Sequence, residues 1–128
     1  MELIGKKILV VDDEEDVRLF LEDFLGERDL TVMTADCGEH ALEKVEENKP
    51  DIVLLDLMMP GIDGIETLRR IKAKHPDIIV IMITALKDDA KIAEAKKLGA
   101  ANYIIKPFRL DYLDNELMRI LKESDSEA

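Results

Sequence analysis

The sequence predicts an α/β fold in which a parallel β-sheet is covered by helices on both faces. Two features of the 128-residue chain carry this prediction. Five short runs rich in isoleucine, valine and leucine recur along the chain, and helical patterns separate them. Three of the runs are continuously apolar, as strands buried on both faces require. Strands that alternate with helices form parallel sheets through right-handed crossovers.

The expected elements follow in order from the apolar spacing. The strands cover residues 8–11, 30–33, 52–55, 78–83 and 102–105. Apolar residues recur at helical spacing over 17–25, 41–45, 65–71, 92–98 and 110–121. Chain-breaking residues lie between elements at Gly26, Pro50, Pro76, Gly99 and Pro107.

Five such units predict a three-layer α/β/α sandwich of the flavodoxin-like type, with five helices and the strand order 2-1-3-4-5. We expect one domain over residues 1–122, because a chain of this length is about one domain long. Residues 123–128 are expected to form a flexible C-terminal tail. In this architecture ligands bind beyond the carboxyl ends of the strands, where the first and third strands lie side by side.

Composition narrows the range of functions. The net charge of −11 disfavours direct binding to nucleic acid, because the phosphate backbone is repelled. A single cysteine, Cys37, excludes an internal disulfide and a multi-cysteine metal cage. No apolar run approaches the ~18 residues of a membrane span, and the first residues lack a secretory pattern, so we expect a cytoplasmic protein.

Acidic side chains follow two strands that are expected to be neighbours. Asp12 and Asp13 follow the first strand, and Asp56 follows the third. Carboxylates packed together repel each other unless a cation joins them, and Mg²⁺ prefers such oxygen ligands. The sequence therefore predicts a divalent-cation site at this edge of the sheet. It leaves open a second interpretation, in which Asp12 and Asp13 cap the helix that begins near Glu14.

The fourth and fifth strands end in Thr84 and Lys106. Each residue alone is ordinary, but Asp-Asp, Asp, Thr and Lys at four strand ends on one edge are an improbable coincidence. A hydroxyl, an ammonium and a cation around a carboxylate suit phosphoryl transfer, which depends on neutralising charge. Asp56 is the expected nucleophile and would form an acyl phosphate. Lys106 and Thr84 are expected to contact the phosphoryl oxygens.

Four stretches of the chain resemble the receiver domains of bacterial two-component response regulators. They cover residues 8–14, 51–64, 81–85 and 99–108, in the order and spacing of the family. The resemblance implies that Asp56 accepts the phosphoryl group from a sensor histidine kinase or a phosphotransfer protein. It also implies that Mg²⁺ or Mn²⁺ is bound by Asp13, Asp56 and the main-chain carbonyl of Met58, with Asp12 acting through bound water.

The resemblance further implies a conformational switch. Thr84 would move toward the phosphoryl group and Tyr103 would turn inward, which changes the face formed by the fourth helix, fifth strand and fifth helix. That face would control a downstream target or an output domain, or form a homodimer. The Lys106–Pro107 peptide bond is expected to be cis. Met58 and Leu86 stand where relatives tune phosphate loss, and because both are apolar and cannot orient water we expect slow loss.

Three other functions compete with this interpretation. An aspartate-nucleophile phosphohydrolase needs a second acid two residues after Asp56, where the chain has Met58. A flavin-binding electron carrier shares the fold, but the acids at 12–15 would repel its phosphate. A receiver-like interaction module that works without phosphorylation is disfavoured by the complete set of site residues. The resemblance implies a signalling domain that catalyses only its own phosphorylation and dephosphorylation, and no enzyme acting on other substrates.

Three residues that suggest metal or redox chemistry are expected to lie outside the site. His40 and His75 lack a partner at metal-ligand spacing and are expected to be solvated surface residues. Cys37 is expected to be a small packed side chain.

Overall fold

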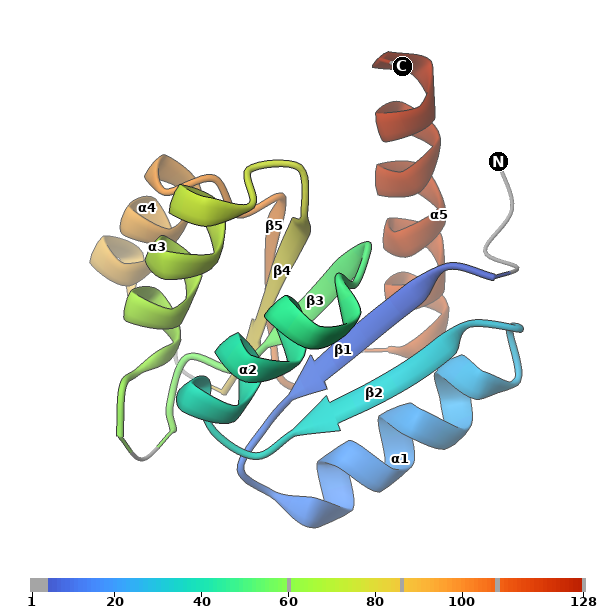
Figure 1. Ribbon diagram of the computed structural model, residues 1–128, viewed down its shortest axis with the longest axis horizontal. Coiled ribbons are helices and arrows are strands. Elements are labelled where there is room, and N and C mark those ends of the chain that lie inside the picture. The colour runs from blue at the N-terminus through green and yellow to red at the C-terminus, as the bar shows by residue number, and fades with distance from the viewer. Residues whose placement is uncertain (1–4, 60, 86, 108, 128) are drawn as a thin grey trace.

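The chain forms one five-stranded parallel sheet with five helices. The computed structural model describes residues 5–59, 61–85, 87–107 and 109–127. The strands are β1 (Lys7–Val11), β2 (Thr31–Ala35), β3 (Ile52–Leu55), β4 (Ile79–Thr84) and β5 (Asn102–Ile105). The helices are α1 (Glu15–Gly26), α2 (Gly38–Asn48), α3 (Gly64–Lys74), α4 (Asp89–Lys97) and α5 (Leu110–Glu127). The strand order is β2-β1-β3-β4-β5, which confirms the predicted sandwich (Figure 1).

Several strand boundaries differ from the prediction by one or two residues, and α5 ends later than predicted. β2 ends at Ala35, two residues beyond the apolar run 30–33. α5 continues to Glu127, so residues 123–127 are helical where the sequence predicted a helix ending near Leu121 and a flexible tail. The prediction followed the apolar stripe, but a helix can extend past its apolar stripe because glutamate and lysine are also good helix formers.

Side chains of the sheet alternate between two apolar cores. Leu9 and Val53 pack with α2, α3 and α4 on one face, whereas Ile8 and Ile52 pack with α1 and α5 on the other. Figure 1 shows these two groups of helices on opposite sides of the sheet. Burial on both faces explains the continuous apolar runs of the strands. Within the part of the chain that the structure describes, no helix is long and apolar enough to cross a membrane.

The parallel register brings polar strand ends together. Val11 of β1 pairs with Leu55 of β3, so Asp12 and Asp56 follow a pair of aligned residues. Backbone hydrogen bonds continue past the strands, because the Asp56 N–H donates to the Val11 carbonyl at 3.0 Å and the Asp12 N–H donates to the Ala35 carbonyl at 3.2 Å. Both aspartates are therefore fixed by the sheet itself.

A glycine holds the loop after β3 close to the start of α3. The Gly64 N–H donates to the Leu57 carbonyl at 2.8 Å. A Cβ at position 64 would overlap the carbonyl oxygen of Asp56 and the Cα of Leu57, which are both backbone atoms. The N-cap residue Asp63 accepts a hydrogen bond from the Glu66 N–H at 2.9 Å, so the helix begins at a fixed point. The missing side chain thus allows the close approach that positions the Asp56 loop.

Replacing Gly64 with alanine should lower the free energy of unfolding by about 1–3 kcal/mol, because the backbone must shift to admit the methyl group. Gly26→Ala is the matched control, since it lies in α1 with nothing within 4 Å of the added Cβ. That control should be neutral or slightly stabilising. Urea unfolding measures both variants, and an unchanged midpoint for Gly64→Ala would contradict the close approach.

Candidate functional site

Three carboxylates meet at the carboxyl ends of β1 and β3, as the strand ends predicted. Asp12, Asp13 and Asp56 each place a carboxylate oxygen within 4.8 Å of the others. Asp12 and Asp56 are only 3% and 6% exposed. Asp13 is exposed, so the group is open to solvent on one side.

Both carboxylate oxygens of Asp12 accept hydrogen bonds. Oδ1 accepts from the Glu14 N–H at 2.9 Å, and Oδ2 accepts from Lys106 Nζ at 2.8 Å. The main-chain carbonyl of Asp12 accepts from Arg18 Nη1 at 2.9 Å, a contact that the sequence did not predict. The N-cap residue of α1 is Glu14, which makes no side-chain cap hydrogen bond. Asp12 therefore belongs to the acidic site, and neither it nor Asp13 is the N-cap residue of α1.

Asp56 lies near the backbone amide of Met58, the hydroxyl of Thr84 and the ammonium of Lys106. Its Oδ1 accepts from the Met58 N–H at 3.2 Å, and its Oδ2 lies 3.5 Å from Lys106 Nζ. The Thr84 side chain, which is 0% exposed, lies close enough to this carboxylate to lower its pKa slightly. The main chain of Lys106 is held near this point because its backbone N–H donates to the main-chain carbonyl of Thr84 at 2.8 Å. The structure thus brings together the residues predicted at four strand ends.

Charge in the site is unevenly balanced. Burial raises the pKa of Asp56 above its ordinary value; Lys106 lowers this pKa and the charge of Asp12 raises it further. Burial also opposes the charged form of Lys106, but the hydrogen bond to Asp12 and the charges of both aspartates outweigh it and raise the pKa of the ammonium. Lys106 therefore stays charged, while the carboxylates carry more charge than one lysine neutralises.

The donor set fits a hard divalent cation. The three clustered side chains offer only carboxylate oxygens, which Mg²⁺ and Mn²⁺ prefer over nitrogen or sulfur. With all three ionised, one lysine leaves two negative charges unbalanced, and a divalent cation would oppose the protonation of Asp56. Exposed Asp13 leaves an open side through which water or a phosphoryl oxygen can approach.

The remaining predicted residues lie around this centre. Tyr103 on β5 is 9% exposed, and burial raises the pKa of its hydroxyl, with smaller contributions from nearby carboxylates. The side chain of Met58 is in contrast 59% exposed. The Lys106–Pro107 peptide bond is cis, as the resemblance implied. Leu86 lies outside the described residues.

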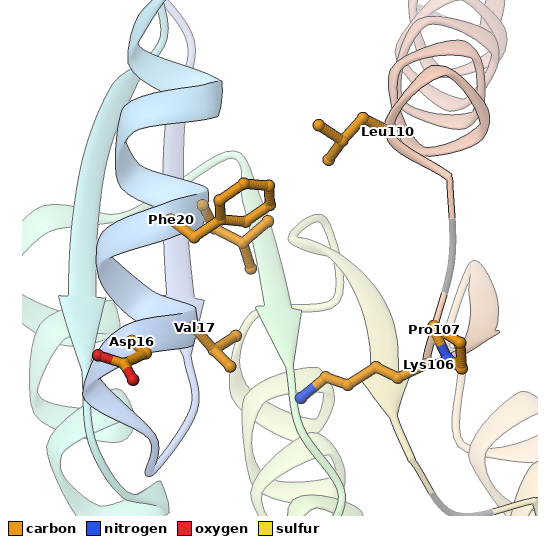
Figure 2. A pocket seen from close by; sticks show the side chains of 7 residues that line it. Asp16, Val17, Phe20, Lys106, Pro107 and Leu110 are labelled. Carbon is orange, nitrogen blue, oxygen red and sulfur yellow. The ribbon is translucent and has the colours of Figure 1, made fainter.

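An apolar groove of about 400 Å³ opens beside the site. Figure 2 shows it between α1 and the segment from β5 to α5, with Lys106 extending toward α1. Phe20, on the α1 side, is 53% exposed. The groove is lined by Asp16, Val17, Phe20, Leu21, Lys106, Pro107 and Leu110. Lys106 therefore belongs both to the groove and to the acidic site.

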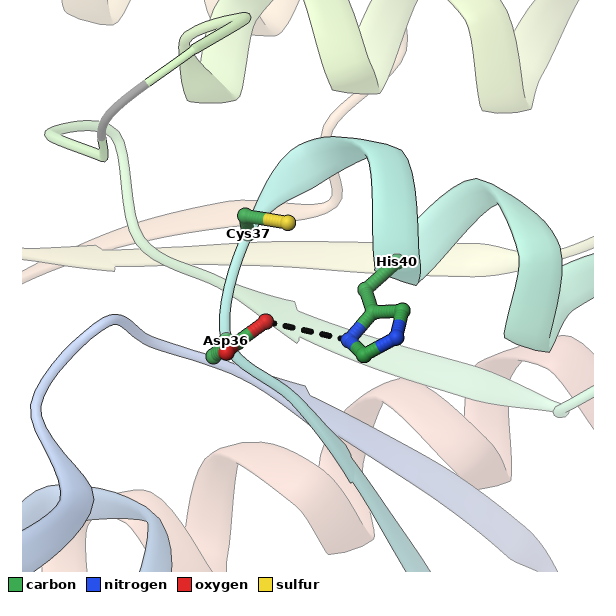
Figure 3. Close-up of side chains that lie close together, drawn as sticks. All are labelled: Asp36, Cys37 and His40. Carbon is green, nitrogen blue, oxygen red and sulfur yellow. Dashed lines mark hydrogen bonds and ion pairs between the residues drawn. The ribbon is translucent and has the colours of Figure 1, made fainter.

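A second group of potential ligands lies where β2 leads into α2. Asp36, Cys37 and His40 each place a donor atom within 4.8 Å of the others, and Figure 3 shows the contact of His40 Nδ1 with Asp36 Oδ1 at 3.0 Å. The prediction that His40 lacks a partner at metal-ligand spacing is therefore wrong. Residues three apart on a helix lie on the same face, so the Cys-x-x-His spacing of Cys37 and His40 could have predicted that these side chains lie close together. His75 was also predicted as solvated, but its side chain is 19% exposed and lies 2.8 Å from Glu46.

Comparison with known proteins identifies the family. Residues 8–118 match the family model of the response regulator receiver domain. The chain therefore belongs to this family. It is a receiver domain of the two-component type and a phosphoacceptor signalling switch.

Relatives of two lengths match this chain. Sporulation initiation phosphotransferase F of Bacillus subtilis is 37% identical over 119 residues, which cover 93% of this chain and 96% of the relative. Chemotaxis protein CheY of Listeria monocytogenes is 38% identical over 91% of this chain and 98% of its own length. The alkaline phosphatase synthesis transcriptional regulatory protein PhoP of Bacillus subtilis is 37% identical, but this chain spans only 52% of it.

Solved structures of receiver domains share the fold. A CheY-like receiver domain protein from Methanospirillum hungatei superposes with a TM-score of 0.94 at 26% identity, covering 97% of this chain and 99% of that one. The BeF3-activated receiver domain of DrrB gives a TM-score of 0.85 at 33% identity, covering 93% of this chain and 99% of that one. The likeness therefore extends over nearly the whole sandwich.

In metal-free buffer at pH 7, Asp56→Asn should raise the free energy of unfolding by an amount on the order of 1 kcal/mol. The pKa of Asp56 is raised in the folded protein, so folding favours the protonated acid. That stabilisation is present below the ordinary carboxyl pKa and is lost as the pH rises through the raised pKa. The difference between the proteins should therefore shrink on acidification.

Urea unfolding at neutral and acidic pH measures this difference. Asp77→Asn, at an exposed aspartate outside the site, is the matched control and should change stability little at either pH. Equal stability of Asp56→Asn and the parent at pH 7 would show that ionised Asp56 is not penalised by burial.

Proposed function

We propose that Asp56 is the phosphoryl acceptor and that Asp12, Asp13 and Asp56 hold Mg²⁺ or Mn²⁺ beside it. The supporting observation is a nearly buried carboxylate whose Oδ2 lies 3.5 Å from an ammonium, beside two further carboxylates at the same strand ends. The main-chain carbonyl of Met58, two residues after Asp56, is the further expected ligand. When bound, the cation supplies positive charge to the carboxylates and to the phosphoryl oxygens.

The side chains around Asp56 suit transfer from a phosphohistidine. The Asp56 carboxylate attacks phosphorus, a P–O bond forms, and the P–N bond breaks with its electron pair returning to the histidine ring. Lys106 Nζ lies close enough to Oδ2 to meet the charge of the arriving group. The Met58 N–H fixes Oδ1 at 3.2 Å, which orients the carboxylate before attack.

Phosphorylation would change the conformation of the domain through Thr84 and Tyr103. The hydroxyl of Thr84 lies near the Asp56 carboxylate, so a phosphoryl group there offers it a new and more highly charged acceptor. Tyr103 lies on the next strand and is buried in the core beside α3 and α4. A change in the position of Thr84 would alter packing around Tyr103 and shift the face formed by α4, β5 and α5.

The phosphoryl donor in this proposal is a sensor histidine kinase or a phosphotransfer protein, acting in the cytoplasm. Such a donor must bring its histidine to Asp56, and the groove beside Lys106 offers an apolar contact surface next to that point. The shifted face would bind a downstream target, an output domain or a second copy of the chain. On α5, Tyr112 and Met118 are 46% and 41% exposed and offer apolar contacts. The net charge of −11 supports protein partners and no direct contact with nucleic acid.

We infer no catalysis on other substrates, only phosphorylation and dephosphorylation of the domain itself. A phosphohydrolase with an aspartate nucleophile needs an acid two residues later to protonate the leaving group. That position is Met58, whose thioether cannot donate a proton.

Incubation with acetyl phosphate and Mg²⁺ should add the mass of one phosphoryl group to the chain, and Asp56→Asn should abolish the addition. Asp77→Asn is the control for a neutral change at an exposed aspartate and should label as the parent does. Intact-protein mass spectrometry measures the result. Labelling retained in a folded Asp56→Asn protein would refute the assignment of the acceptor.

Once formed, the phosphorylated protein should lose phosphate slowly, and Met58→Asn should speed the loss by about tenfold because an amide can orient the attacking water. Met118→Asn is the matched control, since Met118 is also an exposed methionine but lies on α5. The half-life of the phosphorylated species measures both variants. Equal half-lives for Met58→Asn and the parent would contradict a role of this position in hydrolysis.

A further inference from the structure

A cluster of three chemically different ligands lies outside the acidic site. We propose that Asp36, Cys37 and His40 bind a borderline transition-metal ion such as Zn²⁺. Their donors are a carboxylate oxygen, a sulfur and an imidazole nitrogen, which all lie within 4.8 Å of one another. This inference goes beyond the phosphoacceptor function and does not depend on it.

The local backbone explains why these three side chains meet. Asp36 follows the last residue of β2, and Cys37 is the N-cap residue of α2 with an extended backbone at φ −157° and ψ 169°. The Cys37 side chain makes no cap hydrogen bond, so its sulfur is not committed to the helix backbone. His40 lies in the first turn of α2 and returns toward Asp36, with Nδ1 at 3.0 Å from Oδ1 (Figure 3).

The distances suit metal binding with little rearrangement. In a tetrahedral zinc site the bonds are ~2.0–2.3 Å, which puts ligand atoms roughly 3.3–3.8 Å apart. One pair of donors is already at 3.0 Å and every pair lies within 4.8 Å, so shifts of side-chain rotamers suffice. The side chains of Asp36 and His40 are 58% and 54% exposed, which leaves an entry path and an open fourth position.

The donor types distinguish this cluster from the acidic site. Thiolate and imidazole ligands select zinc and its neighbours over Mg²⁺, which takes oxygen ligands. The Glu39 carboxylate lies near Cys37, and its Oε2 accepts a hydrogen bond from the Ile62 N–H at 3.4 Å. The Ile62 amide therefore holds one further carboxylate near the cluster.

Titration of the reduced, metal-free chain with Co²⁺ tests the proposal. Cobalt bound by a thiolate gives a charge-transfer band in the near ultraviolet, and Cys37 is the only cysteine, so the band reports this residue alone. With excess Mg²⁺ present to fill the acidic site, we expect one Co²⁺ per chain at the cluster, displaced by Zn²⁺. Cys37→Ser should remove the band, and His40→Gln should weaken binding by about tenfold or more.

Two control variants separate this cluster from other sites. His75→Gln changes the other histidine, and Asp13→Asn changes the exposed acid of the acidic site; both should leave the cobalt band and affinity unchanged. Circular dichroism and acetyl phosphate labelling confirm that the Cys37 and His40 variants are folded. The proposal is overturned if no band forms, if His40→Gln binds as tightly as the parent, or if Asp13→Asn alone abolishes binding.

Discussion

Asp12 and Asp56 belong to different strands, yet they are buried side by side because β1 and β3 pair in parallel register. Buried carboxylates are costly unless they are paired or hydrogen-bonded. Here the amides of Glu14 and Met58 and the ammonium of Lys106 satisfy them. The two apolar cores fix the register of the strands, so the cost of burying these acids is offset by packing elsewhere in the domain.

The two buried aspartates are not equivalent. Lys106 Nζ is 2.8 Å from Asp12 but 3.5 Å from Asp56, so the lysine is held mainly by Asp12. Asp56 receives weaker contacts, and burial raises its pKa. An ammonium held by one carboxylate beside a second, less neutralised carboxylate can turn toward new negative charge over a short distance. This asymmetry leaves Asp56 the less neutralised of the two buried carboxylates, which suits the acceptor role proposed for it.

The strand order and the positions of the site residues could be predicted because apolar runs and their polar ends are local features of the sequence. Asp56 and Lys106 each end an apolar run, and the order of parallel strands follows from general topology. The Arg18 contact with the Asp12 carbonyl could not be predicted, because it depends on how α1 leaves the first loop. The cluster at Asp36 was missed for a related reason, since the apolar run ends two residues before β2 does, so Asp36 was not placed next to Cys37 and His40.

Lys106 contacts both buried acids and also lines the apolar groove beside α1. Under the proposed function, a substitution at this single position would change two processes together, namely the docking of a phosphoryl donor in the groove and the neutralisation of charge at Asp56. Kinetic defects of such variants cannot be apportioned between docking and chemistry unless a small phosphodonor, which needs no groove, is compared with a protein donor.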